Sequence, residues 1–186
     1  LVTFMDATVD EQVTQAMQDM TANAPLDGLI LDNRMNSGGS STVLEPLLGN
    51  FIGGTLGYFV QHSEQFPLQI KNNDINGSSQ LPLVVLVGHG TMSFGEIFAG
   101  ILQDTRRAYI IGTTTDGNVE ILRGYDFEDG SQLWLANETF LPLNNPEQDW
   151  EKSGIIPDLI VTGDFDQFSL NTDPCIIAAI HYFSDQ

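Results

Sequence analysis

Ser93 is the residue whose type and surroundings most favour nucleophilic chemistry in this chain. It follows the apolar run Leu83–Val87 and a glycine-containing turn, and a helical pattern begins there and continues to about Asp104. A hydroxyl in that position lies at the end of a strand, where the N–H groups and the dipole of a helix N-terminus favour an oxyanion. Serine is also a preferred N-cap residue, so an ordinary helix cap is the alternative interpretation.

A second loop, Asn36-Ser-Gly-Gly39, follows another short apolar run, Gly28–Asp32. Glycine lets the backbone approach a ligand closely, so N–H groups of this loop can form the other half of an oxyanion hole. Ligands of open α/β sheets bind beyond the carboxyl ends of the strands. We therefore expect the two loops to lie at the same edge of one sheet.

Short apolar runs and helical patterns alternate along the chain and define the elements that position these loops. Continuously apolar runs are typical of strands covered on both faces, and so of a parallel sheet under helices. The spacing of Val9, Val13, Met17 and Met20 predicts a helix with one buried stripe. We expect strands at residues 1–5, 28–32, 56–61, 65–70, 83–87, 108–112 and 158–161, and helices from 9, over 40–51 and 93–104, and from 174.

A β-hairpin is predicted in the second half of the chain. Extended runs at residues 119–125 and 131–137 flank the turn tripeptide Glu128-Asp-Gly130. Residues 72–80 and 144–147 are polar and are predicted to be loops. Alternating strands and helices, followed by a hairpin, predict an α/β domain.

The composition excludes several classes of protein. With 25 acidic against six basic residues, the formal net charge of −19 disfavours binding to nucleic acid or to an anionic membrane surface. One cysteine excludes an internal disulfide framework and a cysteine-rich zinc site. No apolar run approaches the roughly 20 residues of a membrane span. The 186 residues have the length of one domain. Because the chain begins without methionine inside an expected strand, we expect a fragment of a longer protein.

Other polar and aromatic residues are given structural interpretations. The three histidines lack the spacing of a zinc motif. The acidic turn at residues 126–129 lacks the alternating ligands of a calcium loop and is expected to be solvated. Trp134 and Trp150 are expected to pack. No metal ion or organic cofactor is expected.

Six segments, in order, resemble those of the carboxyl-terminal processing (tail-specific) serine proteases. The segment Leu29-Ile-Leu-Asp-Asn-Arg-Met-Asn-Ser-Gly-Gly39 is similar to the family signature Leu-Ile-Leu-Asp-Leu-Arg-Asn-Asn-Pro-Gly-Gly. Residues 82–104 are similar to the family's strand, Ser-Ala-Ser-Ala-Ser-Glu turn and helix. The other four segments are Arg107–Gly112, Asp129–Ser131, Gly154–Asp158, and Asp173-Pro174 with Ala178-Ala179. The resemblance implies a single catalytic core domain with a crotonase/ClpP-like α/β fold, related to that of tricorn core protease. That fold has mostly parallel buried strands flanked by helices, with a β-hairpin extension.

The resemblance also implies roles for particular residues. It identifies Ser93 as the nucleophile, and the backbone N–H groups of Phe94 and of Gly38 or Gly39 as oxyanion donors. The two acidic residues that match supporting positions of the family are Glu96 and Asp104. The implied partner is a protein or peptide substrate, bound as an extended segment near a C-terminus. The implied location is extracytoplasmic, periplasmic or at the cell surface.

The chain departs from the family at the general base. Classical members use a Ser–Lys dyad, but the corresponding stretch, residues 112–120, contains no lysine. Simple counting places Asn118 at the position of the base, whereas a two-residue deletion would pair Glu120 with the family's glutamine. A neutral amide cannot accept the serine proton near physiological pH. The Ser–Lys mechanism therefore cannot operate in this sequence as it stands.

Three explanations for the missing base stay open. In the first, a histidine from a segment before the core activates Ser93, as in tricorn-type relatives, and Glu120 orients its imidazole. In the second, the chain is a catalytically inactive homologue that binds a peptide or another ligand. In the third, the base lies within the chain, and His89, four residues before Ser93, is the first candidate. The alternatives are a solvent-facing loop histidine for His89 and a solvated hairpin carboxylate for Glu120.

Overall fold

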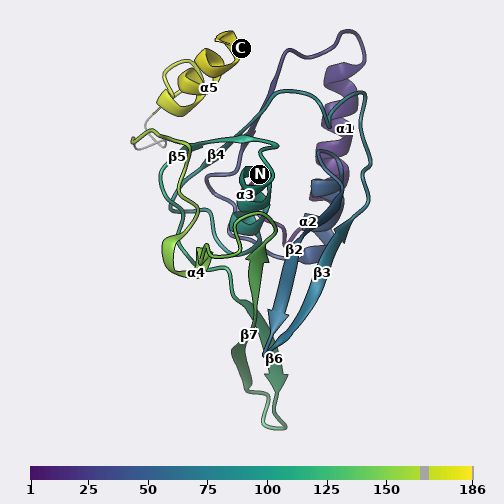
Figure 1. The fold of residues 1–186 in the computed structure, drawn as a ribbon, viewed down its shortest axis with the longest axis vertical. Helices are drawn as coiled ribbons and strands as arrows, with labels where there is room; N and C mark the ends of the chain where they lie inside the picture. The colour runs from purple at the N-terminus through teal and green to yellow at the C-terminus, as the bar shows by residue number, and fades with distance from the viewer. Residues whose placement is uncertain (164–167, 186) are drawn as a thin grey trace.

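The computed structural model describes residues 1–163 and 168–185, which form two four-stranded sheets with helices packed around them (Figure 1). In chain order the elements are α1 (Val9–Thr21), β1 (Leu29–Asp32), α2 (Ser41–Gly49), β2 (Gly54–Gln61), β3 (Glu64–Ile70), β4 (Leu83–Val87), α3 (Phe94–Asp104), β5 (Tyr109–Gly112), β6 (Ile121–Asp126), β7 (Gln132–Pro142), α4 (Trp150–Ser153), β8 (Leu159–Ile160) and α5 (Pro174–Ser184). The fold is α/β, as predicted, but mostly parallel strands were expected, and β2, β3, β6 and β7 form an antiparallel sheet beside the parallel one.

The parallel sheet has the strand order β1-β4-β5-β8. Leu31 of β1 pairs with Val85 of β4, which pairs in turn with Ile110 of β5. Parallel strands end at the same edge of a sheet, so the loops after β1 and β4 emerge next to each other. The N–H of Met92 donates to the carbonyl of Asn36 at 2.9 Å, which joins the two loops directly.

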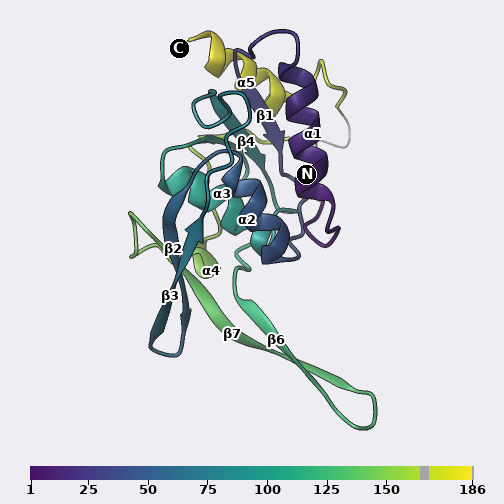
Figure 2. The same cartoon turned by 90° about the vertical axis from the view of Figure 1, so that its right-hand side faces the viewer.

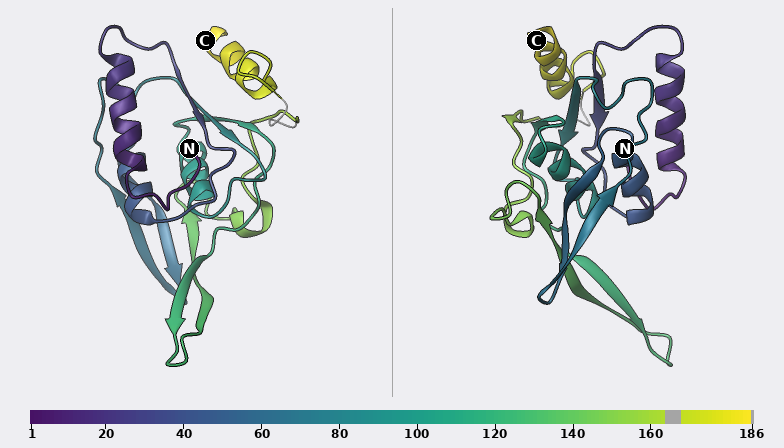
Figure 3. Two further views of the ribbon diagram at one scale, coloured as in Figure 1. Left: turned by 180° about the vertical axis from the view of Figure 1, so that it is seen from behind. Right: turned by 45° about the vertical axis from the view of Figure 1, so that its right-hand side comes forward.

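Helices cover both faces of the parallel sheet, and every residue of β4 is therefore buried. One face contributes to a large core that includes residues of α1, α2 and α3. On the other face, Val84 and Leu86 pack against Cys175 and Ala179 of α5. Figure 3 shows α1 and α5 on opposite flanks of the molecule. This two-sided burial is the reason that β4 is a continuously apolar run.

The antiparallel sheet has the strand order β3-β2-β7-β6. The β6–β7 hairpin, which was predicted, projects from the body as an arm (Figure 2). Neighbouring residues of a strand point to opposite faces, so the exposed Leu133 and Trp134 place apolar surface on both sides of the arm. The exposed large apolar residues of the arm are Leu122, Tyr125, Phe127, Leu133, Trp134 and Leu135.

Residues 1–5 do not form the predicted strand. Phe4 makes a single parallel bridge with Gly39, which is too little for a ladder. Phe4 is fully buried, whereas Val2 and Met5 are exposed. The run is apolar because one of its side chains enters the core, not because it belongs to a sheet.

Two further predictions are corrected by the structure, and one helix was not predicted. The stripe of α1 ends at Met17, which is buried, and Met20 is 46% exposed. Trp150 is buried as expected, but Trp134 is 58% exposed because it lies on the arm, over Gly124. The helix α4 was not predicted, since four residues are too few for a periodic pattern.

A buried arginine joins the end of β1 to the start of α5. The Arg34 guanidinium donates to both carboxylate oxygens of Asp32, at 2.9 and 2.6 Å, and pairs with Asp173 at 2.7 Å. Asp173 in turn accepts the N–H groups of Cys175 and Ile176 and so caps α5. The cluster therefore fixes α5 on the sheet.

The ion pair makes the stability of the fold depend on pH. Burial alone would raise the pKa of Asp32, but hydrogen bonds from Arg34 and its charge lower that pKa below its usual value. A carboxylate with a depressed pKa in the folded state contributes stability above its unfolded pKa. That contribution is lost as the pH falls through the lower, folded pKa.

Replacing Arg34 should destabilise the protein strongly. In Arg34→Ala the carboxylate of Asp173, which is 4% exposed, loses its cation, and we expect the free energy of unfolding to fall by about 3–5 kcal/mol. Urea unfolding measures this change. Lys71→Ala, which removes an exposed positive charge, should unfold within about 0.5 kcal/mol of the wild type. Equal effects of the two substitutions would show that the buried cluster has no special role.

Cys175 should be unreactive while the protein is folded. Its side chain is buried, and burial raises the pKa of the thiol, so little nucleophilic thiolate forms at pH 8. We expect a disulfide reagent such as dithiobisnitrobenzoate to react at least about tenfold more slowly with the native protein than in urea. Cys175 is the only cysteine of the sequence, so absorbance reports it alone. Rapid stoichiometric reaction in native buffer would contradict the prediction.

Candidate active site

The backbone of Ser93 has an unusual conformation for a serine. Its φ is 52° and its ψ is −128°, a region that favours glycine. Ser93 is the N-cap residue of α3, as the alternative interpretation holds, but its backbone angles differ from the extended ones of a usual N-cap residue. Holding a residue with a side chain in such a conformation costs about 1–3 kcal/mol and is typical of functional sites.

The loop of residues 36–39, called the glycine loop below, packs directly against the turn of residues 88–93 that ends at Ser93, called the serine turn. Gly38 has a φ of +83°, and a Cβ at this position would lie 2.6 Å from the Cβ of Ser93 and 3.1 Å from the backbone nitrogen of Phe94. No side chain would fit between the two loops. The structure thus brings Gly38, Ser93 and Phe94 together at the carboxyl edge of the parallel sheet.

The expected oxyanion donors differ in whether their N–H groups are free. The N–H of Gly38 donates to the side-chain oxygen of Asn36 at 3.0 Å. The N–H groups of Gly39 and Phe94 have no acceptor among the residues that the structure describes. Gly39 and Phe94 are therefore the pair with donors available for a ligand.

Two buried asparagines, which the sequence analysis did not single out, hold the glycine loop. The amide of Asn36 donates to the side-chain oxygen of Asn33 at 2.9 Å, and the amide of Asn33 donates to the carbonyl of Gly95 at 2.9 Å. Both side chains are fully buried. The signals in the sequence are their place directly after an apolar strand, where a buried polar residue needs a partner, and the match of Asn36 to an asparagine of the family signature.

Glu96 connects the serine turn to the segment that would carry the base. Its carboxylate is fully buried and accepts the hydroxyl of Thr115 at 2.5 Å. It also accepts the N–H groups of Gly117 at 2.8 Å, Asn118 at 2.9 Å and Ser93 at 3.2 Å. The carbonyl of Asn118 accepts the N–H of Ser93 at 2.8 Å. Residues 115–118 therefore lie alongside the serine turn.

The other predicted site residues lie farther from these contacts. Asp104 is at the opposite end of α3, about 15 Å along the helix from Ser93, where it accepts the N–H of Asn144 at 2.9 Å and the amide of Asn145 at 2.6 Å. It holds a loop and does not contact the serine turn. His89 is exposed and lines a pocket of about 180 Å³ whose lining does not include Ser93.

The side chain of Asn118 is exposed and that of Glu120 is half-buried. Among the described residues, no hydrogen bond or ion pair joins a lysine or histidine to Ser93. The same part of the chain holds no group of three or more histidine, cysteine or acidic side chains placed to bind a metal ion. It also holds no helix long and apolar enough to cross a membrane.

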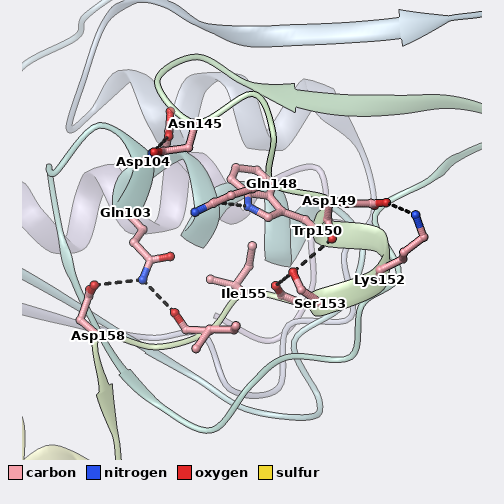
Figure 4. A pocket seen from close by; sticks show the side chains of 12 residues that line it. Gln103, Asp104, Asn145, Gln148, Asp149, Trp150, Lys152, Ser153, Ile155 and Asp158 are labelled. Atoms are coloured by element: carbon pink, nitrogen blue, oxygen red, sulfur yellow. Dashed lines mark hydrogen bonds and ion pairs between the residues drawn. The ribbon is translucent and has the colours of Figure 1, made fainter.

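A pocket of about 540 Å³ lies at the end of α3 that is remote from Ser93 (Figure 4). Its polar side chains bond to one another: Gln103 donates to the carbonyl of Ile156 and to Asp158, and Lys152 pairs with Asp149. Trp150 and Ile155 also line it. Ser93 is not among its lining residues, so this pocket is distinct from the serine turn.

Residues 1–161 match the model of peptidase family S41, and the chain belongs to that family. This confirms the resemblance to the carboxyl-terminal processing serine proteases. The chain is 31% identical over 170 residues to a carboxyl-terminal-processing protease of Synechocystis sp., covering 90% of this chain and 38% of that protein. It is 30% identical over 199 residues to the chloroplastic carboxyl-terminal-processing peptidase 3 of Arabidopsis thaliana, covering 97% of this chain and 37% of that protein.

Solved structures show the same relationship. The photosystem II D1 C-terminal processing protease superposes with a TM-score of 0.77 at 28% identity, over 93% of this chain and 44% of that one. Tricorn protease superposes with a TM-score of 0.62 at 21% identity, over 86% of this chain and 15% of that one, which shows similarity of fold. The chain spans 37–38% of the length of the two curated relatives named above.

Removing one acceptor oxygen from Glu96 should loosen the site. Glutamine has the same shape but a single acceptor oxygen, so in Glu96→Gln some of the buried donors lose their partner. We expect the free energy of unfolding to fall by about 2–3 kcal/mol and amide exchange at Gly117 and Asn118 to accelerate. Urea unfolding and hydrogen exchange measure the two effects. Glu45→Gln, at an exposed position of α2, is the matched control, and an equally small effect of both would contradict the role of Glu96.

Proposed function

We propose that the chain is the core of a serine endopeptidase in which Ser93 is the nucleophile. The hydroxyl oxygen attacks a peptide carbonyl carbon, and the N–H groups of Gly39 and Phe94 bind the oxyanion that forms. The C–N bond then breaks, the amine leaves with a proton, and water hydrolyses the acyl-serine to a carboxylate. The observation that carries this proposal is the glycine-like backbone of Ser93, together with the N–H groups of Phe94 and Gly39, which have no acceptor in the described residues.

The general base in this proposal is a histidine from a segment outside residues 1–186. Support comes from the segment beside the serine turn, where Asn118 occupies the counted position of the base and cannot accept a proton. The half-buried Glu120 is then available to orient the imidazole. His89 is a weaker candidate, because the pocket that it lines does not include Ser93.

The proposed substrate is an extended protein segment near a C-terminus. The names of the relatives, which describe carboxyl-terminal processing, support this substrate class. The superposition on tricorn protease supports a fold of the crotonase/ClpP type. We also propose an extracytoplasmic location, periplasmic or at the cell surface, which fractionation of cells producing the full-length protein would test.

A fluorophosphonate probe tests the nucleophile. In the full-length protein we expect the probe to label Ser93, because the proposed site activates its hydroxyl, and to spare Ser93→Ala. Mass spectrometry of the labelled peptide identifies the residue. Absence of labelling in a folded wild-type protein would refute the proposed peptidase.

A binding module without catalysis is the second candidate, and the observation that favours it is Asn118 at the position of the base. Installing the base tests whether the serine turn is competent. The carbonyl of Asn118 lies 2.8 Å from the nitrogen of Ser93, so in Asn118→Lys the neutral amine of the lysine can come within reach of the hydroxyl and accept its proton. We expect fluorophosphonate labelling at least about tenfold faster than in the wild-type 186-residue chain.

Asn118→Gln, which is uncharged, and Asn118→Lys with Ser93→Ala are the controls for this gain. Neither control should gain labelling. If Asn118→Lys itself gains nothing while remaining folded, the turn is not built for acyl transfer, and the binding module becomes the better interpretation.

A further inference from the structure

Glu151, a residue of α4, holds the two amides that follow Asn118. Its Oε2 accepts the N–H of Val119 at 2.6 Å and the N–H of Glu120 at 3.0 Å. Glu96 accepts the two preceding N–H groups, at residues 117 and 118. Four successive amides therefore donate to two carboxylates, one from α3 and one from α4.

The helix α4 is itself fixed in place. Trp150 is buried against α3, where a Cβ at Gly100 would lie 2.7 Å from the indole ring. Asp149 pairs with Lys152 at 2.5 Å, and its carbonyl accepts the hydroxyl of Ser153 at 3.1 Å, which closes the turn (Figure 4). Glu151 therefore extends from a short but well-anchored element.

Two routes connect α4 to the serine turn. The first is the backbone. The carbonyl of Asn118 accepts the N–H of Ser93, and the next two residues of the chain donate their N–H groups to Glu151. The second is a series of ring contacts from Trp150 through Phe140 and Phe59 to Phe94, with ring centroids 5.5, 5.3 and 6.4 Å apart. Phe94 carries one of the free N–H groups. Ser93 and Phe94 are thus both linked to α4.

We propose that Glu151 is a positioning residue, which fixes residues 118–120 against Ser93 by accepting two successive N–H groups. This inference rests on the proposed peptidase function. Glu151 does not act on the substrate. Without it the amides of Val119 and Glu120 lose their acceptor, and the segment that holds the N–H of Ser93 loosens. One oxygen makes both hydrogen bonds, so a neutral glutamine can replace the carboxylate in this role.

Three substitutions in the full-length protein test the inference. We expect Glu151→Ala to react with a fluorophosphonate about tenfold more slowly than the wild type, and Glu151→Gln to recover most of that rate. Amide exchange at Val119 and Glu120 should accelerate in Glu151→Ala and not in Glu151→Gln. Glu45→Ala removes the same charge from an exposed position on α2 and should match the wild type in both measurements.

The outcomes separate this inference from the proposed function. If Ser93 of the wild type is not labelled, the peptidase proposal fails, and amide exchange alone decides whether Glu151 fixes the segment. If the wild type and Glu151→Ala label equally fast, the inference is overturned while Ser93 remains the nucleophile. If Glu151→Gln reacts as slowly as Glu151→Ala, Glu151 acts by its charge, which also overturns the positioning role. If Glu151→Ala fails to fold, amide exchange in Glu151→Gln is compared with that in Glu45→Ala. Faster exchange in Glu151→Gln alone then overturns the inference.

Discussion

The conformation of the serine turn depends on the hydrogen bonds of one buried carboxylate in the first turn of α3. Glu96 has no exposed surface and accepts hydrogen bonds from Thr115, Gly117, Asn118 and Ser93. A buried carboxylate is costly unless its oxygens have partners, so the turn before α3 and the segment after β5 must take their positions together. The position of Ser93, the proposed nucleophile, therefore depends on a residue three positions later in the chain.

Close contacts at three glycines also fix the elements around Ser93. A Cβ at Gly38 would collide with Ser93, and a Cβ at Gly95 would lie 2.5 Å from the carbonyl of Asn36. At Gly100 the space is taken by Trp150. The glycine loop, α3 and the indole ring of Trp150 are thus packed so closely that a side chain at any of these glycines would force them apart. The parallel sheet makes this possible, because its strands deliver both loops to one edge.

The pattern of apolar residues predicted β4 and α3 almost to the residue, because both elements are almost entirely buried. It failed where a single side chain determines the structure: Phe4 fills the core from a segment that is not a strand. The polar contacts were also beyond prediction. Glu151 and Val119 are 32 positions apart, and nothing local to either residue indicates that they meet. Motifs identified the serine turn, but its hydrogen-bond partners come from tertiary structure.

The backbone angles of Ser93 are unfavourable for a residue with a side chain, yet the proposed site needs a hydroxyl at this position. Glycine adopts a φ of 52° without steric penalty, so a glycine at position 93 would relieve about 1–3 kcal/mol of strain. The chain keeps a hydroxyl at a point where it would fold more readily with no side chain at all. Selection for thermal stability alone would therefore favour glycine at position 93, and it would remove the hydroxyl that we propose as the nucleophile.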